Sequence, residues 1–303
     1  MPASSIHRSS RRSASAARSG FLWRHLVGEY SLARTYWVHT VLLGWGVAFA
    51  GAWLLSAIAD RSTARSVSMA VLMLEPLLFL VWLWSMTGTT VAAIRKLFTG
   101  PGRLWAILAL LAMALSLVAS ANELRRLGPA LKEHLQVALG KQPGDDFVVT
   151  LSSDGRIVAF SGGVNDGAVT AIDKAIGDAP KVGTLLLDSP GGWIREGIRM
   201  ADVVRRYRLN TRVERDCFSS CTIVLLAGEN RSAGPAAQIG FHRGRTIGEA
   251  ASERGRPAPE EEADIYRKAG LREDFVRRIV ATPNNSIFMP TRSELLHEDV
   301  LTR

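Results

Sequence analysis

Two patterns of apolar residues divide the chain. The early part carries three long apolar runs, at about Trp37–Ala59, Val67–Thr87 and Leu104–Ala121. Each run is close to the twenty or so residues that a helix needs to cross a hydrocarbon core of roughly 30 Å. From about residue 146, short apolar runs alternate with segments of helical periodicity. The pattern therefore predicts an anchor of three transmembrane helices, followed by an α/β domain.

Basic residues give the expected orientation of this anchor. A Ser/Arg-rich segment precedes the first apolar run, and the loop between the second and third runs holds Arg95, Lys96 and Arg103. Loops rich in lysine and arginine stay in the cytoplasm. Three spans then export everything after Ala121. We therefore expect a multi-pass protein of the bacterial inner membrane with its C-terminal domain in the periplasm. The Arg-rich, acid-poor start also fits a transit peptide.

The expected organisation has four parts. They are a basic cytoplasmic segment (1–35), three transmembrane helices (36–121), an amphipathic connector (122–145) and the α/β domain (146–303).

Composition narrows the partners and cofactors. The formal net charge is +9 over 303 residues, which is compatible with nucleic acid, anionic lipid or cytoplasmic anchoring. No basic groove with interleaved aromatic residues and no cluster of zinc ligands stands out in the sequence. We therefore expect a lipid bilayer as partner, no nucleic acid, no metal and no cofactor. Two cysteines exclude a disulfide framework.

The α/β domain begins with a predicted hairpin, Phe147–Leu151 and Ile157–Phe160, around Ser153-Asp154-Gly155. The later predicted elements are helices at Ala168–Ile176, Ile194–Tyr207 and Thr222–Ala227, and strands at Leu185–Leu187, Thr211–Arg215 and near Ile239. Strand–helix alternation implies a mostly parallel sheet with flanking helices. Gly248–Glu262 is expected to be an exposed loop before a helix near Ala263–Lys268.

The segment from Ser189 to Gly192 joins a predicted strand to a predicted helix. Backbone N–H groups at a helix start carry partial positive charge, and glycine lets a substrate approach them closely. The amides of Gly191 and Gly192 are therefore candidates for an oxyanion hole. An ordinary Pro-Gly turn is the alternative.

Ser219 stands at the start of the next helix, where a hydroxyl can be a nucleophile on a tight turn. The amide of the following residue, Ser220, is then a second candidate oxyanion donor. An N-cap serine is the alternative. His242 follows a short strand, and a neutral imidazole near a serine can act as its general base. A buried structural histidine is the alternative.

Cys217 and Cys221 lie on either side of Ser219. Their spacing suits a strained disulfide if the turn brings the two Cα atoms within about 6.8 Å, and the exported side of the membrane is oxidising. Two small buried apolar side chains are the alternative.

Together these residues resemble the Clp-type serine peptidase fold of the Clp/crotonase group, and most of all its membrane-anchored, periplasm-facing members in proteobacteria. The resemblance covers roughly 147–300. It implies that the Ser189–Gly192 turn helps to form the oxyanion hole, that Ser219 is the nucleophile and that His242 is the base. It also implies a polypeptide substrate and a homo-oligomer.

The sequence departs from the family at the third member of the triad. The resemblance places a carboxylate near Ser286, but the chain offers only Asn285 or Ser286 there. An Asp-to-Asn change in a triad lowers the rate about 10⁴-fold. Glu298 or Asp299 is an alternative acid. Three hypotheses follow: a serine endopeptidase of Clp type, a catalytically weak or inactive binding or assembly module at the membrane, and a crotonase-like acyl-thioester enzyme.

Overall fold

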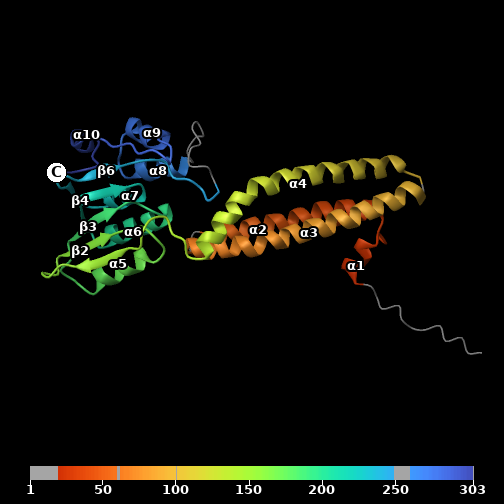
Figure 1. The fold of residues 1–303 in the computed structure, drawn as a ribbon, viewed down its shortest axis with the longest axis horizontal. Helices are drawn as coiled ribbons and strands as arrows, with labels where there is room; N and C mark the ends of the chain where they lie inside the picture. Colours follow the sequence, from red (N-terminus) through yellow and green to blue (C-terminus); the bar gives the residue numbers. More distant parts are fainter. Residues whose placement is uncertain (1–19, 60–61, 100, 249–259, 303) are drawn as a thin grey trace, which may run out of the picture. The chain divides into compact units, whose positions relative to one another are not determined.

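The computed structural model describes residues 20–59, 62–99, 101–248 and 260–302 (Figure 1). Contacts divide the chain into two compact units, residues 1–53 with 74–123, and residues 54–73 with 124–303. The first 19 residues of the predicted basic segment (1–35), and most of the loop predicted over Gly248–Glu262, lie outside the described residues.

Three helices in the described part of the chain are long and apolar enough to cross a membrane, judged by length and composition. The first combines the π-helix η1 (Arg34–Leu43) with α2 (Gly44–Ala59); the others are α3 (Ala64–Thr99) and α4 (Arg103–Ala138), and a short helix, α1 (Phe21–Leu26), precedes them. The prediction of three long apolar helices is thus confirmed. Helix α4 continues to Ala138, so most of the connector predicted over 122–145 is part of the same helix as the third apolar run.

The apolar side chains of these helices are largely uncovered. On α2, Trp45, Phe49 and Trp53 are 71%, 76% and 68% exposed. Such a large apolar surface is unusual for a protein in water. The first unit instead buries polar groups inside. His25 and His39 are both buried with their Nδ1 atoms 2.8 Å apart, and the hydroxyls of Thr40 and Thr89 are also 2.8 Å apart.

The second unit contains the α/β domain. Its strands are β1 (Val148–Leu151), β2 (Ile157–Ser161), β3 (Thr184–Ser189), β4 (Asn210–Phe218), β5 (Arg231–Ala233) and β6 (Gln238–Gly240). Its remaining helices are α5 (Ala168–Gly177), α6 (Ile194–Arg206), α7 (Ser220–Leu225), α8 (Glu260–Lys268), α9 (Glu273–Ala281) and α10 (Arg292–His297). The predicted strands and helices are all present, whereas β5, α9 and α10 were not predicted.

The described strands form one mixed sheet in the order β1-β2-β3-β4-β5, with β6 also pairing with β4 (Figure 1). The β1–β2 hairpin is antiparallel, and every later pairing is parallel. The first half of β4 pairs with β5, and its last three residues, Asp216–Phe218, pair with β6. The prediction of a mostly parallel sheet is confirmed.

Alternating burial along the strands builds the core. In β3 the side chains of Leu185, Leu187 and Ser189 are buried while the residues between them are less so, as the two-residue period of a strand requires. Helix α5 packs on β1 and β2, α7 packs on β3 and β4, and α6 contacts both helices. Because β3, β4 and β6 run in parallel, their carboxyl ends reach the same edge of the sheet.

Candidate active site

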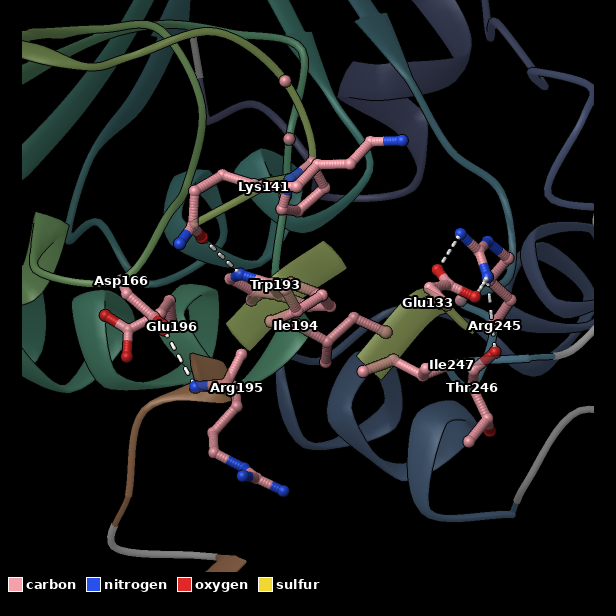
Figure 2. Close-up of a pocket in the computed structure, with 18 of the residues that line it drawn as sticks. Glu133, Lys141, Asp166, Trp193, Ile194, Arg195, Glu196, Arg245, Thr246 and Ile247 are labelled. Carbon is pink, nitrogen blue, oxygen red and sulfur yellow. Dashed lines mark hydrogen bonds and ion pairs between the residues drawn. The ribbon is translucent and has the colours of Figure 1, made fainter. Parts of the chain in front are cut away.

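The turns that follow β3, β4 and β6 line one cavity of about 960 Å³ (Figure 2). The turn after β3 contributes Gly191 and Gly192, the turn after β4 contributes Ser219, and the segment after β6 contributes His242. In α/β folds, ligands bind outside the carboxyl ends of parallel strands. Residues far apart in the sequence are therefore brought together where the fold class favours a binding site.

Ser219 sits on a tight turn between β4 and α7. Its backbone has φ 54° and ψ −128°, and residues other than glycine rarely adopt such a positive φ. The Ser219 amide donates to the Gly240 carbonyl at 3.0 Å, and its carbonyl accepts from the Thr222 hydroxyl at 2.7 Å. The turn is thus held from both sides. Ser219 occupies the N-cap position of α7, but its side chain makes no capping hydrogen bond. The alternative of a serine that caps the helix through its hydroxyl is therefore not what the structure has.

Ser220 differs from Ser219 in where its hydroxyl points. Ser220 is 1% exposed, and its Oγ has no hydrogen-bond partner among the described residues. The Gly197 backbone of α6 packs on it closely, since a Cβ at Gly197 would lie 3.1 Å from Ser220 Cβ. Ser219, in contrast, lines the cavity. Of these two adjacent serines, Ser219 is therefore the one that lines the cavity.

The Ser189–Gly192 turn lies directly on the serine turn. A Cβ at Gly191, where φ is 96°, would come within 2.7 Å of Ser219 Cβ, and a Cβ at Gly192 would come within 2.4 Å of the Val164 carbonyl oxygen. Only glycine allows both approaches. The Val164 amide donates to the Gly191 carbonyl at 2.8 Å, and the Trp193 amide donates to the Val164 carbonyl at 2.9 Å. These two bonds fix the turn against the segment that follows β2.

The amides around the cavity are not equivalent. The Gly191 amide donates to Ser189 Oγ at 3.1 Å, so it is already committed. The amides of Gly192 and Ser220 have no acceptor among the described residues. Of the three predicted donors, Gly192 and Ser220 therefore have amides that are unpaired among the described residues, and Gly191 does not.

His242 is partly buried and lines the same cavity. Its Nδ1 lies 2.8 Å from the Arg243 carbonyl oxygen. A carbonyl can only accept, so Nδ1 carries the proton and Nε2 keeps its lone pair. Burial lowers the pKa of His242 below its ordinary value, and the hydrogen bond to Arg243 opposes this to a smaller extent. The ring is therefore neutral at pH 7, with the tautomer that a general base requires.

The side chain behind His242 is that of Asn284, one position before the predicted Asn285 and two before Ser286. Asn284 Nδ2 lies 3.2 Å from His242 Nδ1 and donates to the Arg243 carbonyl at 3.3 Å. The reason is a turn in which the Ser286 amide donates to the Pro283 carbonyl at 2.9 Å. That turn directs Asn284 towards the ring and leaves Asn285 and Ser286 exposed.

Backbone pairing brings this turn to the histidine. Phe241 and Phe288 exchange hydrogen bonds of 2.9 and 2.8 Å, and the Arg243 amide donates to the Thr282 carbonyl at 3.0 Å. Neither Glu298 nor Asp299, the alternative acids, lines the cavity. Among the described residues, no hydrogen bond joins Ser219 to His242 and no carboxylate hydrogen-bonds to His242 Nδ1. Catalytic hydrogen bonds are often long before a substrate binds.

A disulfide joins Cys217 and Cys221, whose Cα atoms are 5.3 Å apart. Both cysteines are fully buried. The bond closes a short loop that contains Ser219 and ties the end of β4 to the first turn of α7. Of the two alternatives in the sequence, the structure therefore has the disulfide.

A second wall of the cavity was not predicted from the sequence. It comes from the start of α3 and the end of α4, including Val67, Pro129 and Glu133. Figure 2 shows Glu133 paired with Arg245 on one side of the cavity, and Ile194 and Ile247 extending towards each other. No hydropathy signal distinguishes these wall residues from the rest of an amphipathic helix.

Glu196, in the first turn of α6, is a buried carboxylate in the wall. Burial raises the pKa of Glu196 above its ordinary value, while the ion pair with Arg199 at 3.1 Å opposes the shift.

Within the described part of the chain, no group of three or more His, Cys, Asp or Glu side chains is placed to hold a metal ion.

Comparison with known proteins finds matches among solved structures. No protein-family model matches the chain, and no curated protein matches it in sequence. Among solved structures it is similar to ClpP1 from Listeria monocytogenes, with 19% sequence identity and a TM-score of 0.39, over 49% of this chain and 90% of that chain. The likeness is one of fold and says nothing about activity.

Proposed function

We propose that the protein is a membrane-anchored serine hydrolase, most simply a peptidase, in which Ser219 is the nucleophile and His242 its general base. The observation that carries the proposal is the strained turn at Ser219, which holds a hydroxyl in the same cavity as a neutral imidazole. Strained backbone of this kind persists only where the surrounding structure enforces it and is concentrated at functional sites.

The proposed reaction is acyl transfer to the serine. As Ser219 Oγ attacks a carbonyl carbon, its proton moves to His242 Nε2, and the amides of Gly192 and Ser220 stabilise the oxyanion. The proton then passes to the leaving group, and a water molecule deprotonated by His242 releases the acyl group. The Arg243 carbonyl, 2.8 Å from Nδ1, keeps a proton on that atom, so Nε2 is the atom that takes up and releases the serine proton.

The proposed anchor consists of the three long apolar helices, with the α/β domain on the periplasmic side of a bacterial inner membrane. The uncovered aromatic side chains of α2 support burial in lipid. The disulfide supports an oxidising compartment, since such bonds are rare in the cytosol.

A second candidate keeps the fold without the reaction. The group behind His242 is the amide of Asn284 instead of a carboxylate, and an amide cannot stabilise the imidazolium charge as an aspartate does. This observation favours a membrane-tethered binding module that has lost its activity. A crotonase-like thioester enzyme would use the same oxyanion amides without a serine nucleophile.

The test is cleavage of a peptide library by the full chain in detergent micelles, followed by mass spectrometry. The proposal predicts cleavage that Ser219→Ala abolishes and that Ser153→Ala, a matched change at an exposed serine in the β1–β2 turn, leaves unchanged. Absence of any cleavage, with folded protein, would favour the binding module. Activity on acyl thioesters that survives Ser219→Ala would favour the crotonase-like enzyme.

A further inference from the structure

The cavity of the candidate active site has two walls of different origin. One wall is the catalytic edge of the sheet described above, with Ser219 and His242. The other is built by the first residues of α3, with Ala64 and Val67, and by the last turns of α4, from Pro129 onwards. A ligand that fills this cavity would therefore contact both the catalytic edge and the helices that lead into the predicted spans.

The distance from this wall to the predicted spans is short along the chain. Val67 lines the cavity and is also the first residue of the predicted span Val67–Thr87. Pro129 follows the predicted span end at Ala121 by eight residues, which is about 12 Å along a helix. An extended peptide covers that length in about four residues.

Hydrogen bonds and ion pairs hold this wall against the α/β domain. Both carboxylate oxygens of Asp166 accept from the first amides of α3, at Ala64 and Arg65, each at 3.0 Å. Those amides have no partner within their own helix, so Asp166 acts as a cap supplied by a distant segment.

Glu133 of α4 performs the same task on the other side of the cavity. Its carboxylate accepts from Arg245 at 2.6 and 3.0 Å (Figure 2). It also accepts from the Gly248 amide at 2.7 Å. Arg245 follows His242 by three residues, so the segment that carries the histidine is fixed to α4. The juxtamembrane wall is thus a built part of the cavity.

The chemistry of the walls suits an extended peptide with apolar side chains. Val67, Ile194 and Ile247 contribute apolar surface, while the turn at Gly191 and Gly192 leaves room for a backbone to approach. A cavity of about 960 Å³ admits a short stretch of chain and excludes a folded domain.

We infer that the substrate is a juxtamembrane segment, a stretch of polypeptide that emerges directly from its own transmembrane helix and is cut within about ten residues of it. The inference rests on the proposed function. A substrate that shares the bilayer also gains a high effective concentration at the site, which a free peptide lacks.

The test uses the full chain reconstituted in liposomes with two libraries. In one, a randomised segment of twenty residues follows a transmembrane helix; in the other, the same segments are free in solution. The inference predicts that tethered segments are cut at least about tenfold faster and that the cuts cluster within about ten residues of the helix. Equal rates for the two libraries, or cuts spread along the segment, would overturn it.

Two variants test the wall itself. Val67→Trp fills the cavity at its juxtamembrane wall and should lower cleavage of the tethered library at least about tenfold, whereas Met69→Trp, at an exposed position two residues away, should not. Equal effects of the two variants contradict the inference. Labelling of Ser219 by a fluorophosphonate separates the two claims. If Ser219 is labelled but neither library is cut, the inference fails; if Ser219 is not labelled, the proposed function itself fails.

Discussion

Gly191 lies against Ser219 so closely that a methyl group on Gly191 would come within 2.7 Å of Ser219 Cβ and of the Phe218 carbonyl oxygen. The turn after β3 and the serine turn after β4 are therefore a single packed unit. This contact sets the position of the Gly192 amide relative to Ser219.

Gly191→Ala should lower the rate of fluorophosphonate labelling on the order of 100-fold, a loss like that of an oxyanion donor. The added Cβ must displace the serine turn, and alanine at the φ of 96° also costs about 1–2 kcal/mol of stability. Gly183→Ala is the matched control, since a Cβ there meets nothing within 4 Å. Similar labelling of the two variants would contradict the packing argument.

Replacing Asn284 by aspartate should increase the labelling rate at least about tenfold, because a carboxylate beside His242 Nδ1 stabilises the imidazolium ion that forms during attack. Asn285→Asp is the control, since that side chain is exposed in the same turn. If both variants behave like the unmodified chain, Asn284 does not occupy the third position of a triad.

The pH dependence of labelling should report His242. Burial lowers the pKa of this ring, and a general base must be unprotonated. The rate should therefore rise with pH along an acid limb whose midpoint lies below the ordinary value of about 6.5, and then level off. Asn284→Asp should shift that midpoint upwards, because a nearby negative charge favours the protonated ring. A midpoint above 7 in the unmodified chain would argue against His242 as the base.

Loss of the disulfide should destabilise the serine turn. Closing so short a loop contributes about 2 kcal/mol in the chain-entropy treatment, so Cys217→Ser combined with Cys221→Ser should lower the midpoint of thermal unfolding by several degrees. Reductant should do the same to the unmodified chain and leave the double variant unchanged. Two free thiols, counted by mass spectrometry under non-reducing conditions, would show that the bond is absent from the purified protein.

The sequence predicts most of the fold because the hydrophobic periods are clear. Apolar runs of about twenty residues mark α2, α3 and α4, and the alternation of strands and helices marks the parallel sheet. It does not predict β5, which has only three residues, Arg231–Ala233, and no apolar run. The continuation of α4 to Ala138 is missed because a change in polarity does not end a helix.

A site residue can be predicted from the sequence where a reactive or turn-forming residue type stands at a recognisable junction between a strand and a helix. Ser219 and the glycine turn stand at strand–helix junctions, which a sequence can mark. The choice of Asn284 over Asn285 depends on one turn, since successive residues of a turn point in different directions. The wall from α3 and α4 depends on contacts of Asp166 and Glu133 with residues about one hundred positions away. Such contacts leave no local pattern.

The central claim is that Ser219 is a nucleophile activated by His242, and the most direct measurement is the rate at which a fluorophosphonate labels the full chain. We expect a single adduct on Ser219, located by mass spectrometry, and a labelling rate that His242→Gln lowers on the order of 10³-fold or more. An unlabelled Ser219 in folded protein, or a rate that does not change in His242→Gln, would contradict it.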